Sequence, residues 1–183
     1  SDVCSSDLKR FQDGQAVDHI LGDDTTKNVA VIGAGYIGVQ IAEAAKRRGK
    51  NILLFDAVDR ALPNYYDTWF TDDMDKNLAD NGIELHFGEL VQEYKGTDKV
   101  EAIVTTKGEY KADLVINAIG FLPNAKLGHD HLELFKNGAY LVDRHQQTSD
   151  PDVYAVGDCA TVYSNALQAT TYIALATNAI RSG

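Results

Sequence analysis

The chain has 183 residues, 44% of them hydrophobic, which suffices for one domain, or one domain plus part of another, with an ordinary buried core. Its 27 acidic and 17 basic residues give a formal net charge of -10, which argues against a nucleic-acid partner because a phosphate backbone requires a basic surface. There is no run of about 18 apolar residues and no signal peptide, so we expect no membrane span and a cytoplasmic protein.

Residues 1–26 are expected to precede the main domain. Residues 1–7 look like a remnant of cloning or sequencing, so neither they nor Cys4 is expected to contribute to function. A helix is predicted over Leu8–Leu21, and a polar linker over Gly22–Thr26 follows it. The second cysteine, Cys159, is far away and forms no C-x-x-C pair, so we expect no disulfide framework.

A buried strand is predicted over Val29–Ile32, and a glycine-rich turn follows it directly. Gly33, Gly35 and Gly38 make the pattern G-A-G-Y-I-G. The first glycine of such a pattern permits a tight turn, the second lets the backbone approach a pyrophosphate, and the third lets the next helix pack closely. An apolar stripe beginning at Ile37 predicts that helix, whose N-terminus would direct free N–H groups at phosphates.

A second buried strand is predicted over Ile52–Phe55, and it ends in Asp56, 18 residues beyond Gly38. A carboxylate at this place can accept hydrogen bonds from a free ribose 2′-hydroxyl and would repel a 2′-phosphate. Strand, turn, helix, second strand and acid together predict a dinucleotide site that takes NADH rather than NADPH.

The pattern changes after Asp56. A loop containing Pro63 and Asn64 leads to a helix predicted over 68–81. Apolar residues then alternate with polar ones in short strands separated by turn signals, at about 83–87, 90–94, 100–106 and 110–111. These strands indicate an antiparallel meander in place of a crossover helix, followed by a buried strand over 113–116.

Two further motifs follow the meander in the sequence. They are A-I-G-F-L-P-N at 118–124 and T-S-D-P-D-V-Y-A-V-G-D at 148–158, and the run I-A-L-A-T-N-A follows at 173–179. With the G-A-G-Y-I-G turn and the meander, the chain resembles the flavin-dependent pyridine nucleotide-disulfide oxidoreductases. Within that family it is most similar to the subgroup of NADH oxidases, NADH peroxidases and coenzyme A-disulfide reductases, and closest to the water-forming NADH oxidases.

The resemblance implies an NADH site and part of an FAD site. Tyr36 would lie beside the nicotinamide and Tyr65 near the adenosine ribose, although for both tyrosines simple packing with a wet hydroxyl is an equally good interpretation. Asp158 would reach a ribityl hydroxyl of FAD from the end of a strand predicted over Val153–Val156. The implied NADH-binding residues are Gly33, Gly35, Tyr36, Ile37, Gly38, Asp56, Tyr65 and Gly120. The implied FAD-binding residues are Asp158, Ala174, Leu175 and Ala176, the last three near the flavin's pyrimidine edge at the start of a helix.

The resemblance also implies a domain organisation. Residues 8–26 would be a helix and linker from a preceding FAD domain, 27–124 a Rossmann-like NADH-binding domain with a parallel sheet and an antiparallel meander crossover, and 125–183 the C-terminal part of the FAD domain. The family's first flavin motif, its redox-active cysteine and its dimerisation domain lie outside these stretches. We therefore expect no catalytic residue in this chain, and a homo-oligomer only where the C-terminal domain is present.

The expected function is the NADH-binding portion of a flavin-dependent NADH oxidase, which delivers hydride from NADH to FAD for the reduction of oxygen or peroxide. Two alternatives stay open: a fragment of a coenzyme A-disulfide reductase or NADH peroxidase, and a stand-alone binding module without catalysis. Cys159 has no neighbouring base or second thiol and is expected to be a small buried thiol. The five histidines show no metal-ligand spacing, so no metal site is expected.

Overall fold

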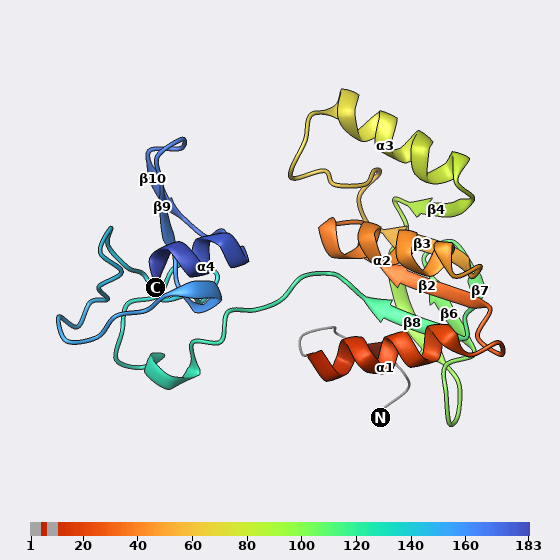
Figure 1. The fold of residues 1–183 in the computed structure, drawn as a ribbon, viewed down its shortest axis with the longest axis horizontal. Coiled ribbons are helices and arrows are strands. Elements are labelled where there is room, and N and C mark those ends of the chain that lie inside the picture. The colour runs from red at the N-terminus through yellow and green to blue at the C-terminus, as the bar shows by residue number, and fades with distance from the viewer. Residues whose placement is uncertain (1–4, 7–10) are drawn as a thin grey trace. The chain divides into compact units, whose positions relative to one another are not determined.

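The computed structural model describes residues 5–6 and 11–183, which form two compact units (Figure 1). The first unit ends at Gly120 and the second spans Phe121–Gly183. The boundary between the two units thus falls four residues before the domain boundary expected after Asn124. The assignment of the two units to an NADH-binding and an FAD-binding domain stays a prediction. The interpretation of residues 1–7 as a remnant falls mostly outside the described residues, and so does Cys4.

A parallel sheet forms the centre of the first unit. In the described residues it has five strands in the order β1-β8-β2-β3-β4. The strands are β1 (Ser5–Ser6), β2 (Asn28–Ile32), β3 (Asn51–Asp56), β4 (Ile83–Phe87) and β8 (Leu114–Asn117). Ile32 at the end of β2 pairs with Phe55 on one side and Asn117 on the other. The carboxyl ends of three strands therefore meet at one edge, where open α/β sheets bind ligands.

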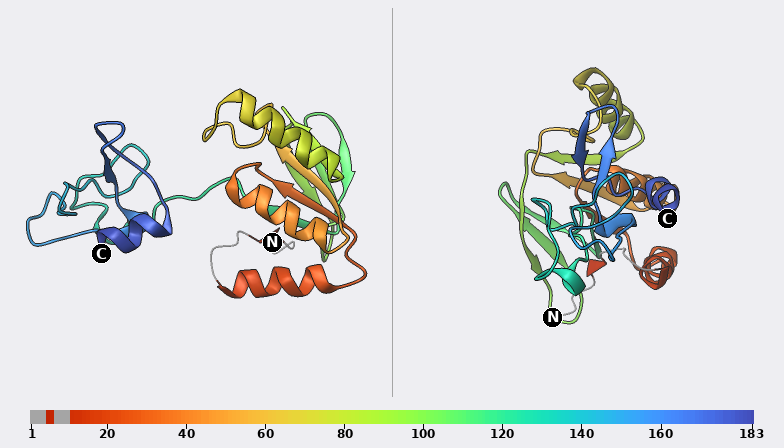
Figure 2. Two further views of the ribbon diagram at one scale, coloured as in Figure 1. Left: turned by 45° about the horizontal axis from the view of Figure 1, so that its top comes forward. Right: turned by 90° about the vertical axis from the view of Figure 1, so that its left-hand side faces the viewer.

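The two faces of this sheet are covered by different kinds of structure (Figure 2). Along β2, Val29 and Val31 pack with the helices, whereas Ala30 and Ile32 pack with the meander, because successive side chains of a strand point to opposite faces. The helices are α1 (Phe11–Gly22), α2 (Tyr36–Arg47) and α3 (Thr68–Asp80). The antiparallel meander consists of β5 (Val91–Lys95), β6 (Ala102–Thr105) and β7 (Glu109–Lys111). The predicted α/β fold with a meander crossover is confirmed.

The second unit has a small core and short elements. Its buried residues are Ala125, Tyr140, Val142, Ala155 and Ala160. Its elements are the 3-10 turns η1 (Lys126–Gly128) and η2 (Gly157–Cys159), the hairpin β9 (Val162–Ser164) and β10 (Ala169–Thr171), and helix α4 (Ala176–Ser182). Tyr140 ties the unit together, since its hydroxyl donates to the carbonyl of Ala125 at 2.9 Å and accepts from the amide of Gly128 at 2.8 Å.

The strand predicted over Val153–Val156 is wrong. Only a single antiparallel bridge, between Gln147 and Tyr154, forms there. A short apolar segment becomes a strand only where a neighbouring strand offers a ladder of hydrogen bonds, and this segment finds one bridge in the described part of the chain.

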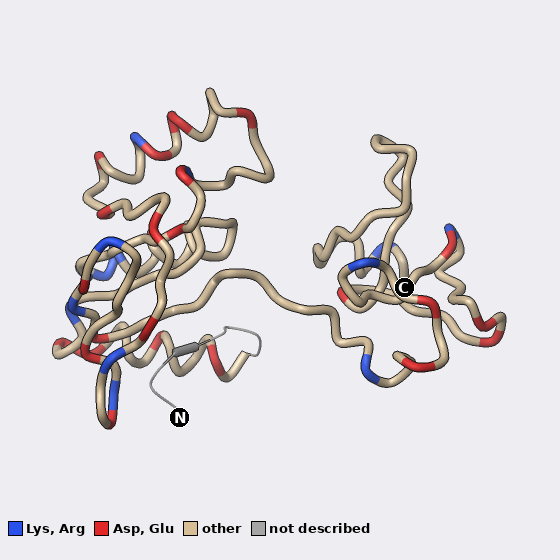
Figure 3. The backbone as a smooth tube through the Cα atoms, turned by 180° about the vertical axis from the view of Figure 1, so that it is seen from behind, with Lys and Arg blue, Asp and Glu red and all other residues tan. Residues whose placement is uncertain are grey.

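Charge and helix length complete the description of the fold. Acidic positions occur along both units, and α3 carries a run of them together with one basic residue, Lys76 (Figure 3). No helix in the described ranges is long and apolar enough to cross a membrane.

Candidate dinucleotide-binding site

The turn between β2 and α2 is shaped by three glycines, each with a different structural reason. Gly33 has φ +100°, and a Cβ added to it would lie 2.5 Å from the carbonyl oxygen of Ala118. A Cβ on Gly38 would lie 1.8 Å from the carbonyl oxygen of Gly33, because helix and turn are in backbone contact. A Cβ on Gly35 would meet nothing within 4 Å. The turn is therefore closed on two sides and open at Gly35, where the sequence predicts the pyrophosphate.

The N-terminus of α2 lies at this open side. Gly35 is the N-cap and makes no side-chain cap, and Val39 is the residue whose amide first bonds back, to the carbonyl of Gly35 at 3.0 Å. The leading amides of a helix, here those of Tyr36, Ile37 and Gly38, have no partner within the helix. Such amides, with the positive end of the helix dipole, suit a diphosphate. The side chain of Ile37 is exposed, so its predicted role rests on its backbone amide.

Asp56 ends β3 directly beside the turn. Its Oδ2 accepts a hydrogen bond from the amide of Ala34 at 2.7 Å, and its Oδ1 accepts one from the amide of Val58 at 2.9 Å. The amide of Gly33 donates to the carbonyl of Phe55 at 2.7 Å, which fixes the turn against the same strand end. The carboxylate faces the glycine turn, and because a carboxylate has about four acceptor positions it can still accept from a ribose hydroxyl.

Two of the predicted aromatic residues meet at the start of α2. The rings of Tyr36 and Tyr65 have centroids 4.2 Å apart at an interplanar angle of 47°. The hydroxyl of Tyr36 lies 3.4 Å from that of Tyr66, and this contact raises the pKa of Tyr36. All three rings are exposed. The structure therefore shows mutual packing with wet hydroxyls and also leaves the rings accessible to a cofactor, so both interpretations of the tyrosines remain.

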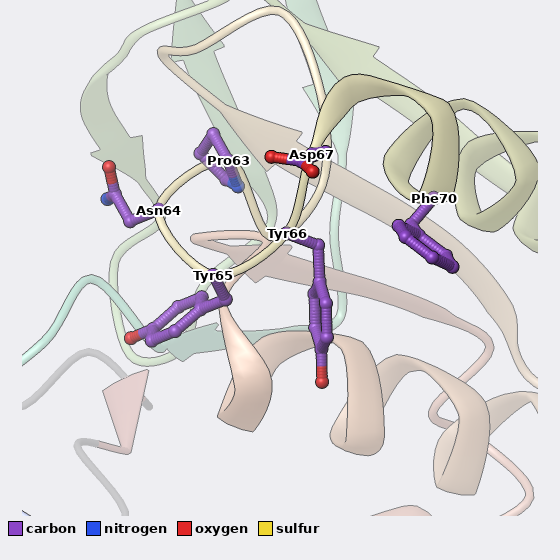
Figure 4. A pocket seen from close by; sticks show the side chains of 6 residues that line it. All are labelled: Pro63, Asn64, Tyr65, Tyr66, Asp67 and Phe70. Atoms are coloured by element: carbon purple, nitrogen blue, oxygen red, sulfur yellow. The ribbon is translucent and has the colours of Figure 1, made fainter. Parts of the chain in front are cut away.

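A shallow pocket lies beside these rings (Figure 4). It has a volume of about 430 Å³ and is lined by Pro63, Asn64, Tyr65, Tyr66, Asp67 and Phe70. The rings of Tyr65 and Tyr66 point from the loop toward the N-terminal end of α2 (Figure 4). The pocket thus adjoins the turn on the side of the loop that follows Asp56.

This loop is held in place by contacts that the sequence did not reveal. Leu62 is buried with φ 53°, a left-handed conformation that is unfavourable for leucine, and its amide donates to the carbonyl of Ala34 at 2.9 Å. The amide of Ala61 donates to Oδ1 of Asp75 on α3 at 3.0 Å, and burial raises the pKa of that carboxyl. Nothing in the sequence distinguishes Asp75 from Asp73, since both are acids on one predicted helix.

Arg60, the basic residue of this loop, is paired with two carboxylates. The guanidinium of Arg60 lies 3.1 Å from Asp59 and 3.4 Å from Asp72, and the hydrogen bond with Asp59 is the main cause of a raised pKa of Arg60. The guanidinium of Arg60 is therefore engaged by two carboxylates.

Gly120 ends the first unit in a conformation that favours glycine. Its φ is +100°, and a Cβ there would meet nothing within 4 Å. Ala118, two residues earlier, donates its amide to the carbonyl of Ile32 at 2.7 Å and lies against Gly33. The segment that contains Gly120 thus leaves the sheet next to the glycine turn, as a backbone approach to the dinucleotide requires.

The residues predicted to bind FAD come together within the second unit. Asp158 lies exposed in η2, and Ala174 and Leu175 precede α4, whose first residue is Ala176. η2 and α4 pack against each other: a Cβ added to Gly157 in η2 would lie at van der Waals distance, 3.7 Å, from the Cβ of Ala179 in α4. The hydroxyl of Tyr172 donates to the carbonyl of Asp158 at 2.7 Å.

The remaining candidates show no reactive arrangement in the described residues. Cys159 is partly buried, and its thiol donates to the carbonyl of Val156 at 3.4 Å. No group of three or more His, Cys, Asp or Glu side chains in the described ranges is placed to hold a metal ion.

Comparisons with known proteins identify the family of the chain. The family model described as pyridine nucleotide-disulphide oxidoreductase matches residues 5–183. The chain is 62% identical over 178 residues to an NADH oxidase of Lactococcus lactis subsp. cremoris, covering 96% of this chain and 40% of that protein. It is 53% identical over 176 residues to an NADH oxidase of Streptococcus pyogenes, covering 96% and 39%. The chain thus spans about 40% of the length of these curated relatives.

Two solved structures are also similar. The water-forming NADH oxidase from Lactobacillus brevis bound to NADH superposes with a TM-score of 0.91 at 37% identity, over 100% of this chain and 40% of that one. An engineered NADPH oxidase bound to NADPH gives a TM-score of 0.91 at 34% identity, over 100% and 40%. The engineered protein is a five-substitution variant of that oxidase, in which a glycine becomes alanine, an Asp-Ala-Met run becomes Ala-Arg-Ser and a proline becomes arginine.

Proposed function

The chain belongs to the pyridine nucleotide-disulphide oxidoreductase family, and we propose that it is the NADH-binding portion of a flavin-dependent NADH oxidase. In this proposal residues 27–124 bind NADH and residues 125–183 supply part of an FAD site. The observation that carries it is the glycine turn, which is open at Gly35 and faces the Asp56 carboxylate. The similarity to NADH oxidases over 96% of the chain supports it.

Each part of the site would have one task. The leading amides of α2, at Tyr36, Ile37 and Gly38, bind the diphosphate, which approaches through the open side of Gly35. Asp56 accepts hydrogen bonds from the adenosine ribose. Tyr36 lies beside the nicotinamide. Tyr65 flanks the adenosine ribose, and the left-handed backbone at Gly120 lets the chain approach the dinucleotide closely.

The second unit fits part of an FAD site. Asp158 presents an exposed carboxylate that can accept from a ribityl hydroxyl, and the amides of Ala174 and Ala176 lie at the start of α4, whereas that of Leu175 donates to the carbonyl of Ile173 at 3.1 Å. The chemistry that FAD supplies when bound is acceptance of a hydride from NADH and delivery of electrons to oxygen or peroxide. This chain binds and orients the two cofactors, and we assign no acid, base or nucleophile to it.

Two observations favour NADH over NADPH. The Asp56 carboxylate beside the glycine turn would repel a 2′-phosphate, and the guanidinium of Arg60 in the following loop is engaged by Asp59 and Asp72. The five positions altered in the engineered NADPH oxidase have the spacing of Gly38, Asp56, Ala57, Val58 and Pro63 in this chain, with valine here in place of methionine. The positions altered in that enzyme therefore correspond to the third glycine of the turn, to Asp56 and to the loop that follows Asp56.

The electron acceptor proposed is oxygen, with peroxide as the alternative. The relatives with the highest identities are NADH oxidases, whereas a coenzyme A polysulfide/persulfide reductase of Pyrococcus horikoshii is 36% identical over 149 residues, covering 81% of this chain and 33% of that protein. The higher identity favours the oxidase.

A segment exchange tests the proposal. Residues 27–183 replace the matching segment of the Lactococcus lactis oxidase, and NADH oxidation is measured together with oxygen consumption and FAD content. We expect the chimera to bind FAD and to consume oxygen with NADH at a rate within about tenfold of the parent, because all cofactor contacts of the segment are kept.

Two controls make the result decisive. The chimera with Asp56→Asn should keep its FAD content while its KM for NADH rises. A chimera that folds and binds FAD but does not oxidise NADH would contradict the proposal and favour a binding module without catalysis.

A further inference from the structure

Glu89 is buried close to the proposed site although no role has been assigned to it. Its side chain is 3% exposed, and it is the only acidic residue among the buried residues of the described ranges. A buried carboxylate is strongly unfavourable unless hydrogen bonds and charges compensate it. Its partners therefore show what it stabilises.

The partners of Glu89 come from three strands. The hydroxyl of Thr105 on β6 donates to the carboxylate, and Nδ1 of His86 on β4 lies 3.4 Å from its Oε2. The hydroxyl of Tyr110 on β7 is the third partner, and it acts on the pKa of the carboxyl. Burial alone would raise the pKa of Glu89, but the interactions with Thr105, Tyr110 and His86 outweigh it and hold this pKa below its ordinary value. The carboxylate is therefore ionised at neutral pH and links the end of the parallel sheet to the meander.

The same residue is bonded to the strand end that carries the ribose acid. The amide of Glu89 donates to the carbonyl of Asp56 at 3.0 Å, and the amide of Gly88 donates to the carbonyl of Val58 at 2.9 Å. Gly88 has φ 61°, which lets the chain turn here after β4. The turn that contains Asp56 is thus attached to Gly88 and Glu89 through its backbone.

A second contact acts on the residue before Asp56. The imidazole of His86 stacks on the ring of Phe55, with centroids 4.5 Å apart and an interplanar angle of 15°. Tyr110 packs edge-on against both rings, at 5.3 Å from Phe55 and 4.5 Å from His86. His86 and Tyr110, which lie beside the Glu89 carboxylate, therefore also pack on Phe55, whose neighbour Asp56 must point its carboxylate at the glycine turn.

We infer that Glu89 is a positioning residue for Asp56: its buried carboxylate, fixed by Thr105, Tyr110 and His86, holds the Asp56–Val58 turn in the orientation that the ribose of NADH requires. The inference rests on the proposed function. Glu89 itself touches no cofactor in this scheme, and it acts through the backbone that it shares with Asp56.

A double-mutant cycle on the full chain tests the inference. The dissociation constant of NADH is measured for the wild type, Glu89→Gln, Asp56→Ala and the combined variant. We expect Glu89→Gln to weaken NADH binding roughly tenfold, and to change it less than twofold once Asp56 is alanine, because coupled residues are not additive. An equal loss in both backgrounds would overturn the inference, since Glu89 would then act through the fold in general.

Glu84→Gln is the matched control. Glu84 lies on β4, is exposed, and contacts Nε2 of the His86 imidazole at 2.9 Å, so Glu84→Gln removes the same charge while leaving every contact of the Glu89 carboxylate in place. NADH binding should stay within twofold of the wild type, and a tenfold loss would overturn the inference.

Tyr110→Phe tests the positioning role of Glu89 if the Glu89→Gln variant does not fold. It removes the hydroxyl that lowers the pKa of Glu89 and keeps the ring contacts with Phe55 and His86, so we expect a smaller loss of NADH affinity that again disappears with Asp56→Ala. An unchanged affinity in this variant would then overturn the inference. Failure of the wild-type chain to bind NADH would instead reject the proposed function.

Discussion

Replacing Gly35 by valine is expected to abolish NADH binding while leaving the chain folded. Gly35 has φ −78° and ψ −172°, an extended conformation that any residue adopts, and a Cβ there meets nothing within 4 Å. The added side chain would instead occupy the space through which a pyrophosphate approaches the amides of α2. Losing two charge-assisted hydrogen bonds, at about 1.5–3 kcal/mol each, weakens binding about a hundredfold or more.

The measurement is NADH titration with a thermal unfolding curve for each variant. Gly33→Ala is the contrasting variant, because Gly33 has φ +100° and its Cβ would lie 2.5 Å from a carbonyl oxygen. That change should lower the free energy of unfolding by about 2 kcal/mol or more, whereas Gly35→Val should leave the unfolding temperature nearly unchanged. Normal NADH affinity in folded Gly35→Val would place the pyrophosphate elsewhere.

Replacing Asp56 by alanine together with Ala57→Arg is expected to change the preferred cofactor from NADH to NADPH. The first substitution removes the acceptor for the 2′-hydroxyl and the charge that repels a 2′-phosphate, and the second supplies a bidentate partner for that phosphate. Each effect is worth about 1.5–3 kcal/mol, so the ratio of the two affinities should change on the order of a hundredfold or more.

Asp56→Asn separates the charge from the shape of the turn. The asparagine oxygen can still accept from the amide of Ala34, so this hydrogen bond is kept and the one from the amide of Val58 is lost, while the repulsion of a 2′-phosphate is reduced. We expect NADPH to bind more tightly than to the wild type and NADH to bind somewhat more weakly, by titration with both cofactors. If NADPH binding stays unchanged in both variants, Asp56 is not the selectivity residue.

Local sequence rules predicted the first unit well. The glycine turn, the helix after it and Asp56 are all within one continuous stretch, where strand period, helix period and backbone requirements point to the same structure. The meander was also predictable, because turn signals such as Lys107-Gly108 separate short alternating strands. The three glycine tasks that the pattern predicts agree with the separate contacts of Gly33, Gly35 and Gly38.

The contacts that the sequence did not reveal connect distant segments. His86 alternates with the apolar residues of its strand, a pattern typical of a solvent-facing side chain, yet it stacks on Phe55 because the parallel register sets the two residues side by side. Asp75 supports the loop after Asp56 by accepting a hydrogen bond from the amide of Ala61, and no local sequence pattern predicts such a bond. The incorrectly predicted strand over Val153–Val156 has the same origin, since strand formation depends on a partner that a local apolar run does not specify.

The most direct test of the central claim is a titration of the unaltered chain with NADH and with NADPH at neutral pH, followed by calorimetry. The amides at the start of α2 and the Asp56 carboxylate predict that NADH binds, with a dissociation constant between about 1 μM and 1 mM, and that NADPH binds at least about tenfold more weakly. Equal affinity for both cofactors, a preference for NADPH, or the absence of binding would contradict the claim that this turn and this carboxylate hold NADH.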